Sequence, residues 1–508
     1  MIGRREVMTA LGLLGFAPQA AAAMARAAAG KGAAAGKTEP FSWEALQARA
    51  ATLAEKPYAA PAKVAAAAAI DYDKVGSIRF RADKTLAGGI RLFPLGRYAP
   101  MPVAINVVEN GQAHRIDFSR GLFEAEEGHA AALGIAGFRA MAPGGTSDWM
   151  AFQGASYFRT AGGQDQYGLS ARGLAINTGL PGREEFPDFT EFWIERTGAD
   201  AYTIYALMDG VSVTGAYRFQ SRHVVGAGTA GGVEQQVSSV LNLRRDIERL
   251  GVAPATSMFW YGEGNRAAAV DWRPEIHDSD GLALLTGAGE RIWRPLNNPP
   301  HDTLDSFADQ APKGFGLIQR DRNFDHYQDD GAFYDRRPNL WIQPQGDWGK
   351  GAVMLYAFPT NSETVDNVVS FWTPAAPAKA GQRLQFDYTL SWQSADPTAV
   401  AATAHVVDCW QGIAGRPGAE PVKGARKLVV DFVGEGLAGL DRQSGVTAKI
   451  DVVRGKILAN AAYPVVGQKN RWRVTADIAP DAQGPADVRL FLTRGGRALS
   501  ETVLTPIF

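Results

Sequence analysis

Ser77-Ile78-Arg79-Phe80-Arg81 alternates polar and apolar residues, and it opens a long series of short segments with the same pattern. Alternation with a period of two is typical of a β-strand that buries one face. Turn residues such as Gly88-Gly89 and Asn110-Gly111 separate the segments. Further segments of this kind are Ile90–Phe93, Ala104–Val108, His114–Phe118, Phe192–Glu195, Ala201–Tyr205, Gly215–Phe219 and Val233–Val240. Many strands at short, regular spacing predict a large β-sandwich rather than alternating strands and helices.

A second strand series follows Ala375–Gly381, a Pro/Ala-rich stretch that lacks large apolar residues, as linkers do. Its segments are Leu384–Trp392, Ala401–Val407, Lys427–Phe432, Ala448–Val453, Trp472–Ile478 and Val488–Thr493. Short strands over about 125 residues suit an immunoglobulin-like sandwich without the cysteine pair of antibody domains. The predicted fold is all-β: a large sandwich over residues 38–374, a linker over 375–383 and a smaller immunoglobulin-like sandwich over 384–508.

Composition excludes several classes of function. The chain has 508 residues, 46% hydrophobic and 21% charged, which is typical of a soluble globular protein with two or more domains. A net charge of −1 argues against nucleic acid or an anionic membrane as the main partner. Cys409 is the single cysteine, so there is no internal disulfide and no multi-cysteine metal site. No Gly-rich phosphate loop follows a predicted strand, so nucleotide binding has no support.

The N-terminus has the features of an export signal. Arg4-Arg5 precede an apolar run from Val7 to Phe16, and Ala21-Ala22-Ala23 offers a cleavage site. The arginine pair favours the twin-arginine route, with an ordinary Sec signal as the alternative. The apolar run is too short to span a bilayer. We therefore predict a signal peptide and low-complexity leader over residues 1–37, and a mature protein in the periplasm.

Residues that commonly take part in catalysis are concentrated in Arg273–Gly281. Four of them are consecutive, namely His277, Asp278, Ser279 and Asp280. If this stretch is a strand, its period of two puts both aspartates on one face. Two like charges on one face repel, share a proton, or hold a cation or a substrate. A metal shell would need further ligands, and no second His or Glu cluster supplies them, so we predict no metal and no cofactor. A Ser-His-Asp hydrolase is disfavoured because the nucleophile elbow is missing.

The region from Pro254 to Trp372 is rich in aromatic, acidic and arginine residues. Its aromatic residues include Trp260, Tyr261, Trp272, Trp293, Phe315, Tyr327, Tyr334, Trp341, Trp348 and Trp372. Its carboxylates include Glu263, Asp271, Glu275, Asp278, Asp280, Asp325, Asp329, Asp347 and Asp366. Sugar rings present an apolar face and a rim of hydroxyls, so a carbohydrate site needs both kinds of side chain. Any single tryptophan is more often a core residue. Glycoside cleavage needs two carboxylates, and spacing alone does not choose the pair.

Several longer runs resemble the periplasmic glucan biosynthesis family called MdoG, or OpgG/OpgD, and the arginine pair is OpgD-like. The runs are Ser156–Arg159, Tyr167–Ala175, Glu184–Pro187, Gly215–Phe219, Ala253–Phe259, Arg273–Leu282, Trp293–Pro299, Gly314–Arg322, Gly346–Gly351 and Asp366–Trp372. The likeness covers nearly all of the mature chain and is weaker after Pro374. It implies a large sandwich similar to galactose mutarotase, followed by an immunoglobulin-like one. It also implies action on osmoregulated periplasmic glucans with a β-1,2-linked glucose backbone.

The resemblance implies roles for individual residues, because family members are similar to inverting endo-β-1,2-glucanases. Asp366, in Thr364-Val365-Asp366-Asn367, is implied as the general acid, and Asp278 as the general base. Tyr334, in Tyr-x-x-Arg-Pro, matches a tyrosine near the cleavage point. Residues expected to relay protons or position substrate are Thr364, Tyr334, Asp280, His277 and Arg273. Residues expected to bind substrate are Trp293, Arg320, Arg322, Asp347, Trp348 and Lys350.

This mechanism makes physical demands that a structure can test. Asp366 must hold a proton near neutral pH, so burial or a neighbouring acid must raise its pKa. Asp278 must stay ionised, and Arg273, His277 and a nearby lysine are the candidates for its partner.

Two further functions remain open from sequence. One is a transglycosylase that passes the cleaved chain to a sugar hydroxyl and closes a ring, and the other is a non-catalytic glucan-binding assembly factor. A glucan synthase in the membrane is the expected protein partner, and the sequence predicts no oligomeric state.

Overall fold

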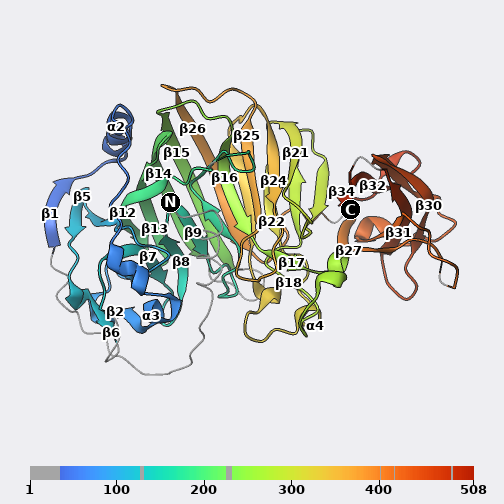
Figure 1. Cartoon of the computed structure of the whole chain (residues 1–508), viewed down its shortest axis with the longest axis horizontal. Helices are drawn as coiled ribbons and strands as arrows, with labels where there is room; N and C mark the ends of the chain where they lie inside the picture. Colours follow the sequence, from blue (N-terminus) through green and yellow to red (C-terminus); the bar gives the residue numbers. More distant parts are fainter. Residues whose placement is uncertain are drawn as a thin grey trace.

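The structure is a computed structural model that describes residues 35–125, 131–182, 184–224, 231–400, 402–416, 418–481 and 484–508. Within these residues one mixed sheet has sixteen strands (Figure 1). Its order is β1 (Ala35–Pro40), β5 (Gln112–Ile116), β4 (Ala104–Glu109), β12 (Asp188–Gly198), β13 (Ala201–Asp209), β14 (Val213–Val224), β15 (Gly232–Leu243), β26 (Arg383–Gln393), β23 (Asn339–Gln345), β22 (Gly314–Ile318), β19 (Gly281–Leu285), β20 (Arg291–Pro295), β34 (Thr502–Ile507), β32 (Ala486–Arg494) and β29 (Val446–Val453), with β33 (Arg497–Ala498) beside β32.

A second sheet of ten strands, counted over the same residues, packs against the first. Its order is β21 (Thr303–Gln310), β24 (Lys350–Ala357), β25 (Val368–Pro374), β16 (Leu250–Ser257), β10 (Ser170–Arg172), β9 (Tyr157–Thr160), β8 (Asp148–Gln153), β7 (Ile135–Met141) and β3 (Ile90–Pro94), with β11 (Leu174–Ile176) beside β16. Phenylalanines fill the space between the sheets: the Phe152 and Phe158 rings of the second sheet meet Phe219 of the first at 5.2 and 4.9 Å. The predicted all-β sandwich is confirmed, and each strand segment predicted from sequence overlaps a strand.

The strand β26 corrects the expected domain limits. Sequence analysis placed Leu384–Trp392 at the start of the smaller domain, after a linker over 375–383. In the structure β26 pairs with β15 on one side and β23 on the other, near the middle of the large sheet. The Pro/Ala-rich stretch is therefore a crossover from β25 in one sheet to β26 in the other, and Lys379 fixes it by an ion pair with Asp246 at 2.8 Å. We infer that the smaller domain begins after Gln393.

The smaller domain is a sandwich that shares its sheet with the larger one. A separate four-stranded sheet has the order β27 (His405–Ile413), β28 (Arg426–Val433), β31 (Arg471–Pro480) and β30 (Gly455–Pro464). Its apolar face packs against β32 and β34, which continue the large sheet because β34 runs parallel to β20. Figure 1 shows this domain in orange and red at one end of the molecule. Its core also includes Trp293, Ile318 and Trp341 of the large domain.

Helices are short, and the longest of them packs against β13, β14 and β15 of the large sheet. They are α2 (Trp43–Ala54), α3 (Tyr72–Ser77) and α4 (Phe324–Tyr327), with the 3-10 turns η2 (Ala65–Ala69), η3 (Ala82–Lys84), η4 (Arg120–Leu122), η6 (Glu263–Ala268), η7 (Tyr334–Arg336) and η8 (Glu435–Leu437). Two further two-stranded sheets pair β2 (Ile78–Phe80) with β6 (Phe123–Ala125), and β17 (Phe259–Tyr261) with β18 (Ile276–His277). Over the described residues, no helix is long and apolar enough to cross a membrane.

Residues 1–34 of the predicted signal peptide and leader lie outside the described residues. The predicted leader ended at Lys37, but β1 begins at Ala35 and pairs with β5, so its last residues belong to the folded domain.

A buried arginine joins the two domains. The Arg320 side chain is 7% exposed and donates to Asp396 at 2.8 Å and to Glu501 at 2.6 Å. Its guanidinium also lies 3.7 Å from the Trp293 ring centre. Asp396 follows β26, whereas Glu501 precedes β34, so one cation holds the ends of segments far apart in sequence. A buried ion pair that loses one partner leaves an uncompensated charge in the interior.

We predict that Arg320→Ala lowers the free energy of unfolding by about 3–5 kcal/mol, because Glu501 and Asp396 lose their counter-charge. Lys379→Ala, which breaks the exposed pair with Asp246, is the matched control and should cost about 1 kcal/mol or less. Urea denaturation of both variants measures the difference. Equal effects of the two substitutions would contradict the structural role of Arg320.

Candidate active site

The two aspartates of Arg273–Gly281 do not share a face. The strand β18 ends at His277, so Asp278 and Asp280 lie beyond it. The backbone N–H of Asp278 donates to Met258 O at 2.8 Å, whereas that of Asp280 donates to Ile318 O at 2.9 Å. The chain thus turns between the second sheet and the large sheet, and each carboxylate meets different partners. The expectation of a paired face is wrong because the strand is too short.

Asp278 forms a buried ion pair with Arg337. Asp278 is 3% exposed and Arg337 is 8% exposed, and the guanidinium Nη1 donates to Asp278 Oδ1. The same guanidinium lies 4.0 Å from the ring centre of Tyr334, and its Nε donates to Ala332 O at 3.4 Å. The pair compensates both charges in the interior. Arg337 is thus the ion-pair partner of Asp278, whereas the predicted candidates Arg273 and His277 bond to other residues.

Asp366 is buried close to the same arginine. It is 2% exposed and lies two residues before β25. Burial raises the pKa of Asp366 to about 7, against the charges of Arg159 and Arg337, which lower it. The neighbouring Asn367 anchors this loop, because its side chain accepts from Phe259 N at 2.9 Å and donates to Phe358 O at 2.9 Å. Near neutral pH a large share of Asp366 therefore carries a proton.

Arg273 gathers carboxylates at the mouth of the site. It donates to Asp271 Oδ2 at 2.7 Å, Asp329 Oδ2 at 2.8 Å and Glu363 Oε2 at 2.7 Å. The Tyr334 hydroxyl donates to the same Glu363 oxygen at 2.6 Å. Because Glu363 is three residues before Asp366, Arg273 and Tyr334 fix the loop that carries the buried acid.

His277 and Asp280 belong to a buried network behind the site. His277 lies 3.1 Å from Glu275 and from Gln319, and 3.4 Å from Asp280. Burial lowers the pKa of His277, but the hydrogen bond to Glu275 and the charge of Asp280 outweigh it and raise the pKa to about 9. Asp280 also accepts from the backbone N–H of Asp321 at 2.7 Å. These contacts hold the loop after β22, and none of them reaches Asp278.

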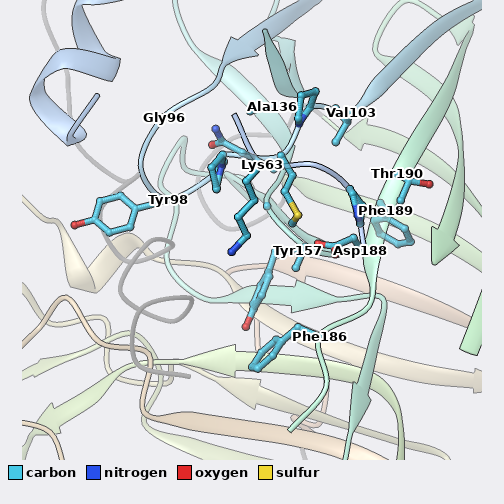
Figure 2. A pocket seen from close by; sticks show the side chains of 18 of the residues that line it. Lys63, Gly96, Tyr98, Val103, Ala136, Tyr157, Phe186, Asp188, Phe189 and Thr190 are labelled. Carbon is cyan, nitrogen blue, oxygen red and sulfur yellow. The ribbon is translucent and has the colours of Figure 1, made fainter. Parts of the chain in front are cut away.

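A pocket of about 290 Å³ shares one wall residue, Tyr157, with the surroundings of the buried acid. Tyr157 lines it, and Tyr157 and Arg159 lie on one face of β9 because strands have a period of two. The charge of Asp366 acts on both side chains. Figure 2 shows Lys63 extending into the pocket above Tyr157 and Phe186. The pocket is further lined by Tyr58, Tyr72, Tyr98, Asp188 and Phe189.

Comparison with known proteins identifies the family. Residues 41–507 match a protein-family model described as "Periplasmic glucan biosynthesis protein, MdoG". The chain belongs to the MdoG family.

Curated relatives agree with this membership. The chain is 44% identical over 498 residues to "Probable glucans biosynthesis protein D" of Shewanella oneidensis, covering 94% of this chain and 90% of the relative. It is 41% identical over 538 residues to "Glucans biosynthesis protein D 2" of Ralstonia nicotianae, covering 99% and 97%. It is 43% identical over 491 residues to "Glucans biosynthesis protein D" of Xanthomonas oryzae pv. oryzae, covering 92% and 90%. The family predicted from the sequence runs is confirmed.

In this MdoG-family protein some residues predicted to bind substrate lie in the interior. Trp293 is 3% exposed and packs in the core of the smaller domain, beneath Arg320. Arg322 donates to the backbone carbonyls of Asp335 and Arg337, so it supports the segment that carries Arg337. Thr364 lies closer to the site, and its hydroxyl is 2.8 Å from that of Ser362.

Asp347, Trp348 and Lys350 lie far from the acid. They surround the turn from β23 to β24, where Gly351 pairs with Pro374 at the end of β25. Asp366 precedes the other end of β25, where Val368 pairs with Ala357. The six residue steps from Gly351 to Ala357 place these two ends roughly 20 Å apart. Trp348 is moreover buried and donates to Asp387 O at 3.3 Å.

Sequence reasoning missed Arg337, Arg159 and Glu363 as site residues. Arg337 stands in the quoted Tyr-x-x-Arg-Pro run, so the motif contained it, but nothing local assigns its partner. Its contact with Asp278 spans 59 positions in sequence.

One group of possible metal ligands occurs among the described residues, namely Glu275, Asp321 and His326, whose ligand atoms lie within 4.8 Å of one another. Glu275 already bonds to His277, and His326 to Asp321. Hydrogen bonding accounts for the proximity of these side chains, and no metal role follows.

We predict that Asp366→Asn stabilises the protein at pH 8. The pKa of Asp366 is about 7 in the folded protein and roughly 3.9 in the unfolded chain. Between about pH 3.9 and pH 7 only the folded protein keeps this carboxyl group protonated, so the free energy of unfolding falls as the pH rises through that range. Asparagine has no proton to lose, so at pH 8 the Asp366→Asn protein should have a free energy of unfolding higher by up to about 4 kcal/mol. Thermal denaturation at pH 5 and pH 8 measures it, with exposed Asp330→Asn as control. A stabilisation equal at both pH values would refute the raised pKa.

Proposed function

We propose that this protein cleaves the β-1,2-linked glucose backbone of periplasmic glucans as an inverting endo-β-1,2-glucanase. The description of the family it belongs to, periplasmic glucan biosynthesis, supports a glucan as substrate. One observation carries the reaction type: a buried acid with a pKa of about 7, Asp366, lies near an arginine that is ion-paired to a second acid, Asp278. Glycoside cleavage by inversion needs one protonated and one ionised carboxyl group.

In the proposed reaction the Asp366 carboxyl gives its proton to the glycosidic oxygen as the bond from that oxygen to the anomeric carbon breaks. A water attacks the anomeric carbon from the opposite face, and its proton passes to Asp278 through the hydroxyl and water relay implied by the family. The products are two shorter chains, one with a new reducing end. Asp278 then holds the proton that Asp366 has lost, and exchange with solvent restores both groups.

Arg337 suits this exchange of charge. Before cleavage its guanidinium compensates the Asp278 carboxylate. After cleavage Asp278 is neutral and Asp366 is charged, and the nearby positive charges of Arg337 and Arg159 favour that charged form. The total charge of the two acids is the same before and after cleavage. The buried Arg337 guanidinium therefore stabilises the charged acid in each state without changing its position.

The neighbouring pocket suits a sugar chain. Its lining combines tyrosine and phenylalanine rings with Lys63 and Asp188. Burial raises the pKa of Asp188 to about 7, and nearby Asp209 adds to that rise while Lys63 opposes it. A carboxyl group near its pKa both donates and accepts hydrogen bonds, as sugar hydroxyls do. We propose that glucosyl residues next to the cleaved bond occupy this pocket.

We further propose that the protein works in the periplasm after export by the twin-arginine route. The family description supports the compartment, and Arg4-Arg5 before the apolar run supports the route. A membrane glucan synthase is the proposed source of the glucan.

Incubation of the pure protein with linear β-1,2-glucan tests the activity. We predict shorter reducing chains with the wild type, no cleavage with Asp366→Asn, and a loss of at least about 100-fold in rate with Asp278→Asn. Glucan binding should persist in Asp366→Asn, which leaves the ion pair between Arg337 and Asp278 in place. Mass spectrometry distinguishes the alternatives: products lighter by one water would indicate cyclisation, and unchanged glucan would favour a binding protein. Full activity of Asp366→Asn would reject Asp366 as the acid.

We also predict that kcat/KM falls as pH rises through about 7, because Asp366 must be protonated and its carboxyl group ionises there in the free protein. A pH profile from 5 to 9 measures the falling limb. A rate that stays constant from pH 6 to 9 would mean that another group, or none, supplies the proton.

A further inference from the structure

Among the aromatic residues that the sequence suggested as sugar platforms, one stands out by its exposure. A platform needs an open ring face, and Trp272 is 70% exposed. Trp260 is half-buried, and the others are buried: Tyr261, Trp293, Phe315, Tyr327, Tyr334, Trp341, Trp348 and Trp372. Tryptophan buries a large apolar area when it packs in a core, so an indole left in water is informative.

Trp272 is held in place by its neighbours in sequence. The Asp271 carboxylate accepts from the Tyr261 hydroxyl at 3.0 Å and from the backbone N–H of Arg273 at 2.8 Å. Arg273 in turn donates back to Asp271 at 2.7 Å. The backbone on both sides of Trp272 is thereby fixed. Because the protein backbone around Trp272 is already ordered, a ligand that stacks on the indole binds with a smaller loss of conformational entropy.

The same contacts connect Trp272 to the active site. Arg273 donates to Glu363, which also accepts from the Tyr334 hydroxyl. Tyr334 lies against Arg337, the partner of Asp278, and Glu363 lies on the loop that leads to Asp366. Both sequence neighbours of Trp272 thus belong to the hydrogen-bond network that reaches the site, and we call the exposed segment between them the rim.

We propose that Trp272 is a carbohydrate platform on which a glucosyl residue remote from the cleaved bond stacks. The proposal rests on the proposed function, because it takes a β-linked gluco-oligosaccharide as the ligand. The apolar face of the sugar ring covers the indole. Since Trp272 touches no reacting atom, it contributes to the affinity for chains long enough to reach the rim, and it leaves the rate of bond cleavage unchanged.

Calorimetric titration with linear β-1,2-gluco-oligosaccharides of increasing length tests the platform in the non-cleaving Asp366→Asn background. We expect Trp272→Ala to raise the Kd for long chains about tenfold and to leave the Kd unchanged for chains too short to reach the rim. Trp272→Tyr should restore most of the affinity. Val270→Ala, 72% exposed in the same loop, is the matched control and should bind like the parent. In the cleaving enzyme, Trp272→Ala should raise KM and leave kcat unchanged.

The outcomes separate this inference from the proposed function. Equal affinity of the Trp272→Ala protein and its parent for every chain length would overturn the platform, while cleavage by the wild type would leave the function standing. Binding that depends on Trp272 in a wild type that does not cleave would support the platform and reject the glucanase. Absence of binding by the Asp366→Asn parent, together with absence of cleavage by the wild type, would overturn both.

Discussion

The ion pair between Arg337 and Asp278 is the interaction on which the rest of the site depends. Both side chains are buried, and the Arg337 guanidinium is the ion-pair partner of Asp278, while the carboxylates Glu363 and Asp366 also favour its charge. The same guanidinium packs on Tyr334 and acts on Asp366, so its position decides where a positive charge stands relative to both acids. Burial alone raises the pKa of Asp366, and the arginines limit that rise to about 7. Arg337 is thus the cation that both acids share: it is ion-paired to Asp278, and its charge acts on Asp366.

The fold brings these groups together at one end of the sandwich. Arg337 comes two residues before β23 of the large sheet, and Asp366 two residues before β25 of the second sheet. Asp278 lies on the turn that connects the two, because its backbone bonds to Met258 just beyond β16. The acid and the arginine thus come from opposite layers. Arg320 then fixes the smaller domain beside the site through Asp396 and Glu501.

Local patterns were sufficient for much of this structure. Alternation within segments such as Ser77–Arg81 and Ala201–Tyr205 identified strands correctly, because a half-buried strand shows its period in its own residues. Partners far apart in sequence were not predictable in this way. Ala375–Gly381 has the composition of a linker, and only the pairing of β26 reveals a crossover. The sequence named the candidate acids. The pairing of Arg337 with Asp278 and the burial of Trp293 result from contacts between distant segments, which no local pattern predicts.

The claim that Asp366 is protonated near neutral pH beside a charged Asp278 can be measured without a substrate. Carboxyl carbons report their protonation in NMR spectra of protein labelled with ¹³C at aspartate, and Asp366→Asn assigns the signal. We predict that the signal lost in this variant titrates in the wild type with a pKa of about 7. A pKa near 4 would contradict the account, because Asp366 would then be ionised throughout the range in which it must donate a proton.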